Sequence, residues 1–252
     1  MYYYEVMEKV LQHHEAVEKL GYTVVLTALV GSQNYGLDDE YSDIDTFSLI
    51  LPSLRELSDA RKPEAGEFEV EDGKCMYKDI REALNLLKKP SPNSVEMFST
   101  YYIHFNPLYK DIALKYLDGR NLQYMVHSDY SHMLTACAGM AHQLTKRNMP
   151  SGKRYAHALR LVLLVYKYTE SLDVRNLFKL SGETRINARA AKRDKERNEW
   201  YDQQCEQISN DLDKFKAKFT TTITQKMYEK IGKELIELFQ IELIKRHLEV
   251  IR

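Results

Sequence analysis

The residues best suited to chemistry lie in one short stretch of the chain and in two carboxylates that follow it. The stretch covers residues 31–37 and opens with Gly31-Ser32, and Asp43 and Asp45 follow, separated by one residue. Because strand side chains alternate between faces, Asp43 and Asp45 are expected to point the same way, with Ile44 toward the core. Carboxylate oxygens beside a turn that exposes backbone N–H groups could hold Mg²⁺ and a nucleoside triphosphate.

Two apolar runs flank these residues and are predicted to be buried strands. Residues 23–30 precede the Gly-Ser turn, and residues 46–51 follow the two carboxylates. The alternative interpretation is a surface hairpin with solvated loop charges, namely Asp38, Asp39, Glu40 and Asp43. We favour a functional site, because burying an unpaired carboxylate such as Asp45 at the start of an apolar strand is costly.

The combination of Gly31-Ser32, Asp43-x-Asp45 and the flanking strands resembles the signature of the DNA polymerase β-like nucleotidyltransferase superfamily. The chain looks like one branch of it, the predicted nucleotidyltransferases common in bacteria and phages. Two further blocks are similar to this branch: Asp79-Ile80-Arg81 with residues 93–96, and residues 153–160. The resemblance extends over roughly residues 23–180.

The block at residues 153–160 also has a physical interpretation of its own. Lys153, His157 and Arg160 lie at positions i, i+4 and i+7, so they share one face of a predicted helix. Arginine binds phosphates in bidentate fashion and lysine supplies a point charge, so this face could clamp a triphosphate. Spacing alone allows interdomain salt bridges equally well, and the resemblance favours contact with substrate.

The resemblance implies a complete set of site residues. The nucleotide-binding residues are Gly31, Ser32, Asn34, Tyr35, Ser42, Lys153, His157 and Arg160. The catalytic and metal-binding residues are Asp43, Asp45 and a third carboxylate, which we assign to Glu69. Glu71, on the same face of the predicted strand, is the next choice, and Asp79 is expected to begin a helix instead. If no third carboxylate reaches the metals, the protein binds nucleotide without efficient turnover.

The implied reaction is transfer of a nucleoside monophosphate from an NTP to an acceptor hydroxyl, with release of pyrophosphate. The implied cofactor is Mg²⁺ or Mn²⁺, as two ions. ATP is the default donor because it is abundant, and RNA, a protein or a small molecule could be the acceptor. The sequence names neither the acceptor nor an oligomeric state.

Two alternatives from other functional classes are kept. One is a catalytically degenerate nucleotide- or partner-binding module on the same fold. The other is a nucleic-acid-binding protein that uses the basic segment at residues 185–197, namely Arg185, Arg189, Lys192, Arg193, Lys195 and Arg197. For that segment we favour the solvated face of a helix, because Glu183, Asp194 and Glu196 are interspersed with the cations.

Composition places the chain among ordinary globular proteins. The net charge of −1 gives the 252-residue chain no overall attraction for nucleic acid. Its three cysteines, Cys75, Cys137 and Cys205, lack metal-type spacing, and their odd number argues against a disulfide framework. No secretory h-region and no apolar run near the roughly twenty residues of a membrane span are found, so a cytoplasmic location is expected.

Periodicity predicts an α+β fold, with a small mixed β-sheet and flanking helices followed by an α-helical C-terminal domain. The resemblance implies that the first part is a nucleotidyltransferase core. The predicted domains are residues 1–107 and residues 108–252, the second closing over the nucleotide and acceptor site. The other predicted strands are 67–70 and 74–78. The predicted helices are 4–20, 79–87, 93–102, 108–117, 132–146, 153–170, 185–210 and 224–251. The isolated histidines are expected at surface or satisfied core positions: His13, His14, His104, His127, His132, His142 and His247.

Overall fold

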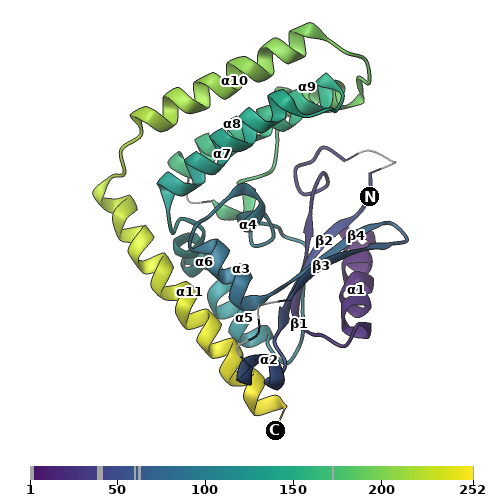
Figure 1. Ribbon diagram of the computed structural model, residues 1–252, viewed down its shortest axis with the longest axis vertical. Coiled ribbons are helices and arrows are strands. Elements are labelled where there is room, and N and C mark those ends of the chain that lie inside the picture. The colour runs from purple at the N-terminus through teal and green to yellow at the C-terminus, as the bar shows by residue number, and fades with distance from the viewer. Residues whose placement is uncertain (1–2, 39–41, 60, 62–63, 172, 252) are drawn as a thin grey trace.

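The computed structural model describes residues 3–38, 42–59, 61, 64–171 and 173–251. The fold is α+β, as predicted, with one five-stranded mixed sheet and a helix-rich C-terminal region (Figure 1). The strands are β1 (Thr23–Val30), β2 (Asp45–Leu51), β3 (Ala65–Val70), β4 (Gly73–Asp79) and β5 (Ile103–Phe105). They lie in the order β3-β4-β2-β1-β5.

The strand register brings the ends of three strands together. β1 is antiparallel to both β2 and β5, β3 is antiparallel to β4, and β2 is parallel to β4. Val30 lies opposite Asp45, and Thr46 lies opposite Cys75. The end of β1, the start of β2 and the start of β4 therefore meet at one end of the sheet. The predicted chemistry lies at this end.

Helix α1 (Tyr3–Lys19) covers one face of the sheet through its buried Val6, Val10 and Val17. Burial of such an aliphatic side chain stabilises the fold by about 1.5–3 kcal/mol. Two histidines of α1 lie within this layer: His13 Nδ1 is 2.8 Å from Thr46 Oγ1, and His14 Nδ1 is 3.0 Å from Thr27 Oγ1. Burial lowers the pKa of His14 to about 4, so this ring is neutral at pH 7. Both histidines are satisfied core residues, as predicted.

Helices cover the opposite face. Short α2 (Leu54–Ser58) follows β2, and α3 (Ile80–Leu87) packs against β2 and β4. Asp79 is the N-cap of α3, as predicted: it accepts the Arg81 N–H at 2.8 Å and pairs with the Arg81 guanidinium at 2.6 Å. The next helices are α4 (Pro92–Glu96), α5 (Lys110–Leu117) and α6 (Gly119–Val126).

The C-terminal helices form a second layer and a long return. Helices α7 (Tyr130–Lys146), α8 (Ser151–Glu170), α9 (Gly182–Arg193) and α10 (Glu199–Lys218) pack on one another beyond the end of the sheet, with the short η1 (Val174–Asn176) between α8 and α9 (Figure 1). Helix α11 (Ile223–Val250) then runs back along α6, α3 and α5. Near its end, His247 Nε2 donates to the carbonyl of Pro52 at 3.1 Å, while Nδ1 accepts from the Tyr109 hydroxyl at 3.0 Å. None of the described helices is both long and apolar enough to cross a bilayer.

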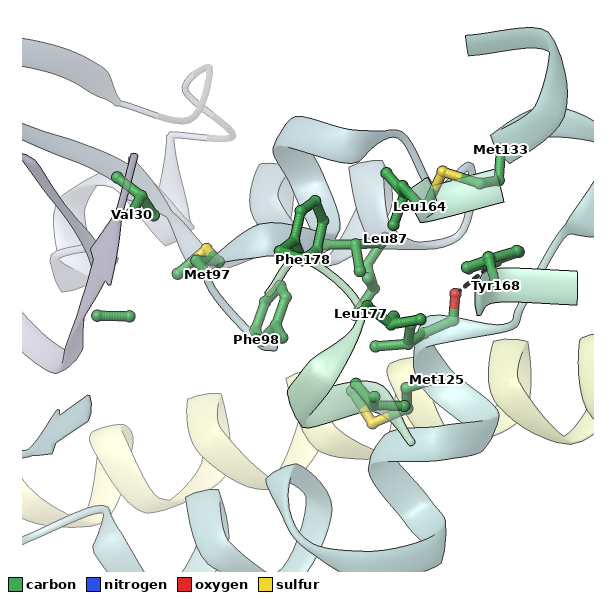
Figure 2. Packing of buried hydrophobic residues seen from close by; sticks show 14 of the residues in the cluster. Val30, Leu87, Met97, Phe98, Met125, Met133, Leu164, Tyr168, Leu177 and Phe178 are labelled. Atoms are coloured by element: carbon green, nitrogen blue, oxygen red, sulfur yellow. Dashed lines mark hydrogen bonds between the residues drawn. The ribbon is translucent and has the colours of Figure 1, made fainter. Parts of the chain in front are cut away.

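One buried hydrophobic cluster extends from Val25 to Leu243 and so crosses the predicted boundary at residue 107. Figure 2 shows part of it, including Val30 at the end of β1, Met97 and Phe98 after α4, and Leu164 and Phe178 from the C-terminal half. The two halves thus share a core. Their division into separate domains stays a prediction.

Three elements differ from the sequence-based prediction. Residues 93–102 were predicted as one helix, but α4 ends at Glu96 because Arg175 holds the following segment, donating to the carbonyls of Phe98 at 3.0 Å and Thr100 at 2.6 Å. The chain then pairs with β1 as the short strand β5. The predicted helix 185–210 is two helices, because residues 194–198 form a turn bound to Ser151. Helix α6 was not predicted.

Candidate active site

The Gly-Ser turn begins where β1 ends. Gly31 has a φ of +84°, in the left-handed region that favours glycine. A Cβ at this position would lie 3.1 Å from Oδ2 of Asp45, so the missing side chain also makes room for that carboxylate. The turn is closed by backbone bonds from Asn34 N–H to the Gly31 carbonyl at 3.1 Å and from Leu37 N–H to the Ser32 carbonyl at 2.9 Å.

A buried carboxylate, Glu96, holds this turn from behind. It is 6% exposed, and it accepts the Gly31 N–H at 2.6 Å and the Tyr35 hydroxyl. Burial raises its pKa, and Arg160 opposes that rise. The Arg160 guanidinium lies 3.8 Å from the centroid of the Tyr35 ring, in cation–π contact. Because Glu96 occupies the Gly31 N–H, that donor is not available to a phosphate.

Glu96 has a positioning role that the sequence did not assign. Glu96 is the final residue of the block at 93–96, which the sequence analysis had singled out. No spacing rule, however, could connect it to a turn more than sixty positions earlier. The Asn34 side chain lies near Glu96, opposes the rise in the pKa of that carboxyl, and is not part of the cavity lining described below. Asn34 therefore lies on the same side of the turn as Glu96.

The two aspartates stand at the start of β2. Asp43 is exposed, Ile44 is buried in the core and Asp45 is half-buried, which follows the predicted alternation. The strand begins at Asp45, so Asp43 precedes it. Asp45 Oδ1 accepts the Lys74 N–H at 3.2 Å. Burial raises the pKa of Asp45, and the neighbouring charge of Asp43 acts in the same direction.

The hairpin between β3 and β4 supports these aspartates. Ile44 N–H donates to the Asp72 carbonyl at 2.7 Å. Gly73, with a φ of +154°, lies so close that a Cβ would collide with the Ile44 carbonyl. A glycine is therefore needed at this turn for the segment between the two aspartates to approach it.

Glu69, the predicted third carboxylate, lies outside the cavity lining. Its side chain is 75% exposed and pairs with Lys74 Nζ at 3.3 Å. Its charge still contributes to the raised pKa of Asp45. Among the residues that the structure describes, no three His, Cys, Asp or Glu side chains come together as a metal site. The role of Glu69 stays a prediction.

A cavity of about 790 Å³ opens in front of the turn and the aspartates. Nine of the predicted site residues line it: Gly31, Ser32, Tyr35, Ser42, Asp43, Asp45, Lys153, His157 and Arg160. The last three come from α8 and share one face, as the spacing predicted. The cavity therefore places two carboxylates and a Gly-Ser turn in one space with the side chains of Lys153, His157 and Arg160.

His157 is neutral in this environment. Burial lowers its pKa to about 3, and the positive charges of Arg160 and Lys153 contribute to that shift. A neutral imidazole can offer one hydrogen-bond donor and one acceptor to a substrate. It adds no charge at pH 7, so Lys153 and Arg160 are the cations of this face.

Helix α9 contributes to the site in a way that corrects our interpretation of the basic segment. Arg185 Nε donates to the Gly36 carbonyl at 2.8 Å, Lys192 Nζ donates to the Leu37 carbonyl at 3.0 Å, and Arg189 donates to the carbonyl of Asp38. Lys192 Nζ is also 3.4 Å from Ser42 Oγ. The solvated-face interpretation is therefore wrong for these three residues, which bind the segment after the Gly-Ser turn.

The far end of the same segment reaches the cavity. Lys192, Arg193 and Lys195 also line it. The sequence offered a signal for the helical part, because Arg185, Arg189 and Lys192 repeat the i, i+4, i+7 spacing of the α8 face. It offered none for the acceptors, which are backbone carbonyls.

The chain's own residues fit divalent metal ions. Two carboxylates face one cavity, and burial together with their mutual repulsion raises the pKa of Asp45, so a cation between them would relieve both effects. Mg²⁺ typically binds through one or two carboxylates plus substrate phosphates and waters. The donor set at Asp43 and Asp45 matches this preference.

A mixed sheet that places a Gly-Ser turn beside an Asp-x-Asp pair defines the class of DNA polymerase β-like nucleotidyltransferases. The comparison with family models agrees. The chain belongs to the RNA repair pathway DNA polymerase β family, RlaP, whose model matches residues 4–231. No curated protein matches the chain.

Proposed function

We propose that the protein transfers a nucleoside monophosphate from an NTP to the hydroxyl of an RNA end and releases pyrophosphate. The observation that carries this proposal is the cavity of about 790 Å³, in which Asp43, Asp45 and the Gly-Ser turn share one space with Lys153 and Arg160. The family's description as part of an RNA repair pathway supports RNA as the acceptor. ATP is the default donor.

Asp43 and Asp45 would hold Mg²⁺ or Mn²⁺. Metals bound there supply Lewis acidity and lower the pKa of the attacking hydroxyl. Glu69 remains the proposed third ligand, and its side chain would have to leave Lys74 to take that role.

The protein's own groups bind and orient the donor. The Ser32 hydroxyl and backbone N–H groups after Gly31 would bind the β- and γ-phosphates, since Gly31 N–H is already bonded to Glu96. Lys153 would neutralise charge that develops on the leaving pyrophosphate. Arg160 is held over Tyr35 and near Glu96, so it sets the position of the turn as well as the charge of the cavity.

The test is incubation of the purified protein with each α-³²P-labelled NTP and Mg²⁺ or Mn²⁺, with and without total cellular RNA. Label should appear in RNA and should be lost in the Asp43→Ala/Asp45→Ala variant. A matched control is Asp211→Ala/Asp213→Ala, which removes the same charge from the exposed surface of α10. No labelled product from the unmodified protein with any NTP would contradict the proposal.

A second candidate is nucleotide binding without turnover. The pairing of Glu69 with Lys74 outside the cavity favours it, because active members of the superfamily usually carry a third carboxylate. Transfer by the unmodified protein separates the two, and the Glu69→Gln variant tests the role of Glu69 where transfer occurs. A loss of transfer as large as that of Asp45→Asn makes Glu69 a metal ligand, whereas metal-dependent NTP binding with no transfer by the unmodified protein supports the binding module.

A further inference from the structure

The charge of the cavity exceeds what a metal-bound donor requires. Its lining carries five cations, Lys153, Arg160, Lys192, Arg193 and Lys195, against two carboxylates, Asp43 and Asp45. An NTP with two divalent ions has a net charge of about zero. Even with Arg160 balanced by Glu96 behind it, positive charge remains after the donor has bound. This excess calls for a second anionic group in the cavity, and an acceptor that carries phosphates would supply it.

The excess positive charge is concentrated where α9 ends and the turn toward α10 begins. Arg193 and Lys195 are exposed and line the cavity, while Asp194 and Glu196, which alternate with them, do not. Among the residues that the structure describes, neither Arg193 nor Lys195 has an ion-pair partner. Both cations are thus presented toward a ligand.

An aromatic cluster lies at the other end of this turn. Trp200, the single tryptophan of the chain, is 52% exposed. Its ring contacts those of Tyr155 and Tyr201 at centroid distances of 5.3 Å and 5.4 Å, and Tyr155 stacks on Tyr201 at 5.3 Å. Both tyrosines meet Trp200 in edge-to-face geometry, at interplanar angles of 70° and 67°, and about half of the Trp200 surface stays accessible. Exposed aromatic rings beside cations are how proteins bind single-stranded nucleic acids, by base stacking and phosphate contacts.

The turn is firmly held. Ser151 Oγ donates to the Glu196 carbonyl at 3.2 Å and accepts the Asn198 N–H at 2.8 Å. Gly152, at the start of α8, lies so close to the Ala191 carbonyl that a Cβ would collide with it. The cations and Trp200 are therefore fixed relative to the Lys153 end of α8.

We propose that the turn at residues 193–200 is a docking surface for a single-stranded nucleic acid, with phosphates on Arg193 and Lys195 and a base stacked on Trp200. The strand's end then enters the cavity toward Asp43 and Asp45. The placement of that end rests on the proposed function, whereas the binding surface does not.

The experiment uses Trp200 as its own reporter. A 12-nucleotide single-stranded RNA of mixed sequence is titrated into the full chain without NTP or metal, and tryptophan fluorescence is followed. Stacking should quench the fluorescence to saturation. A duplex of the same sequence should compete about tenfold less well, because its bases are not free to stack.

Variants test the two parts of the surface through the anisotropy of fluorescein-labelled RNA. Trp200→Ala should weaken binding about tenfold, and Trp200→Phe should restore most of it. Arg193→Gln/Lys195→Gln should weaken binding and reduce the slope of log K against log salt by about one to two. The matched control, Lys214→Gln/Lys216→Gln, makes the same charge change at the other end of α10 and should bind as the unmodified protein does.

Several outcomes would overturn this inference. They are an absence of quenching, equal affinity for the duplex, equal weakening by the control variant, or competition by polyglutamate as strong as that by RNA. The last result would indicate an acidic protein as partner. RNA binding without label transfer would leave the surface in place and reject the proposed function. Label transfer to RNA without quenching of Trp200 would reject the surface and keep the proposed function, and label transfer to a protein or small molecule without RNA binding would reject both.

Discussion

Helices α8 and α9 carry basic faces with the same spacing but put them to different uses. Lys153, His157 and Arg160 of α8, and Arg185, Arg189 and Lys192 of α9, both follow i, i+4, i+7. The α8 face lines the cavity, whereas the α9 face donates to the backbone carbonyls of residues 36–38 and reaches the cavity only through Lys192. Spacing therefore predicts which side chains act together. What they bind depends on the element that lies opposite.

The two faces also differ in what surrounds their charges. Burial together with neighbouring cations keeps His157 neutral. The α9 cations have fixed acceptors, so they order a loop. On this basis substitutions in α8 should affect the chemical step, and those in α9 should affect the ordering of the site.

The largest expected effect comes from the α8 face. Lys153→Gln should lower the kcat of nucleotidyl transfer about 100-fold, because a cation on the leaving pyrophosphate is lost in the transition state. Thermal stability should hardly change. The control is Lys146→Gln, an exposed lysine at the end of α7 outside the cavity lining. Unchanged kcat for Lys153→Gln would break the distinction between the two helices.

A smaller effect of a different kind is expected from α9. Arg185→Gln/Arg189→Gln removes two donors to the loop carbonyls and should raise KM for the NTP about tenfold with little change in kcat. Steady-state kinetics over a range of NTP concentrations measures both constants. A fall in kcat as large as that of Lys153→Gln would show that the α9 face takes part in the chemical step.

The pH dependence of stability sharpens the contrast further. The pKa of His157 is about 3 in the folded protein, below its ordinary value near 6.5, so the unfolded state binds more protons between these values. The free energy of unfolding should therefore fall as pH drops from about 6.5 toward 4, by up to about 1.4 kcal/mol per pH unit from this group. The free energy of unfolding, measured by urea titration at several pH values, should depend less steeply on pH for His157→Gln than for His132→Gln. His132 is an exposed histidine of α7.

The smallest effect concerns the support behind the turn. Tyr35→Phe removes the hydroxyl that donates to buried Glu96 and should lower the free energy of unfolding by about 1–2 kcal/mol. The ring that receives Arg160 remains, so transfer activity should fall less than in Lys153→Gln. Chemical denaturation followed by circular dichroism gives the stability change. An unaltered denaturation midpoint would mean that the hydrogen bond from the Tyr35 hydroxyl to Glu96 does not stabilise the fold.

The sequence predicted the site best where function and fold are local. Gly31, Ser32, Asp43 and Asp45 lie within fifteen positions, and two apolar strands bracket them, so their meeting required only one turn. The roles of Glu96 and Arg185 required partners far along the chain. Every residue has a backbone carbonyl, so the sequence does not indicate which carbonyls accept hydrogen bonds from Arg185.

The fold shows the same limit. Strands β1 and β2 are long and apolar, so their periodicity sufficed. Strand β5 has three half-buried residues and exists because the edge of β1 accepts it. The break between α9 and α10 depends on Ser151, over forty residues earlier, which no helical pattern in residues 185–210 could reveal.

The path of α11 has a consequence for how the chain is made. His247 closes the core beside β2 by bonding to Pro52 and Tyr109, and α11 also covers α3, α5 and α6. The first half of the protein therefore leaves the ribosome without its covering helix, and at about 5–20 residues per second it waits on the order of ten seconds for it. During that interval the apolar sides of α3 and α5 lack their final partner. Folding of the half that contains the sheet is thus expected to finish only after translation has passed residue 250.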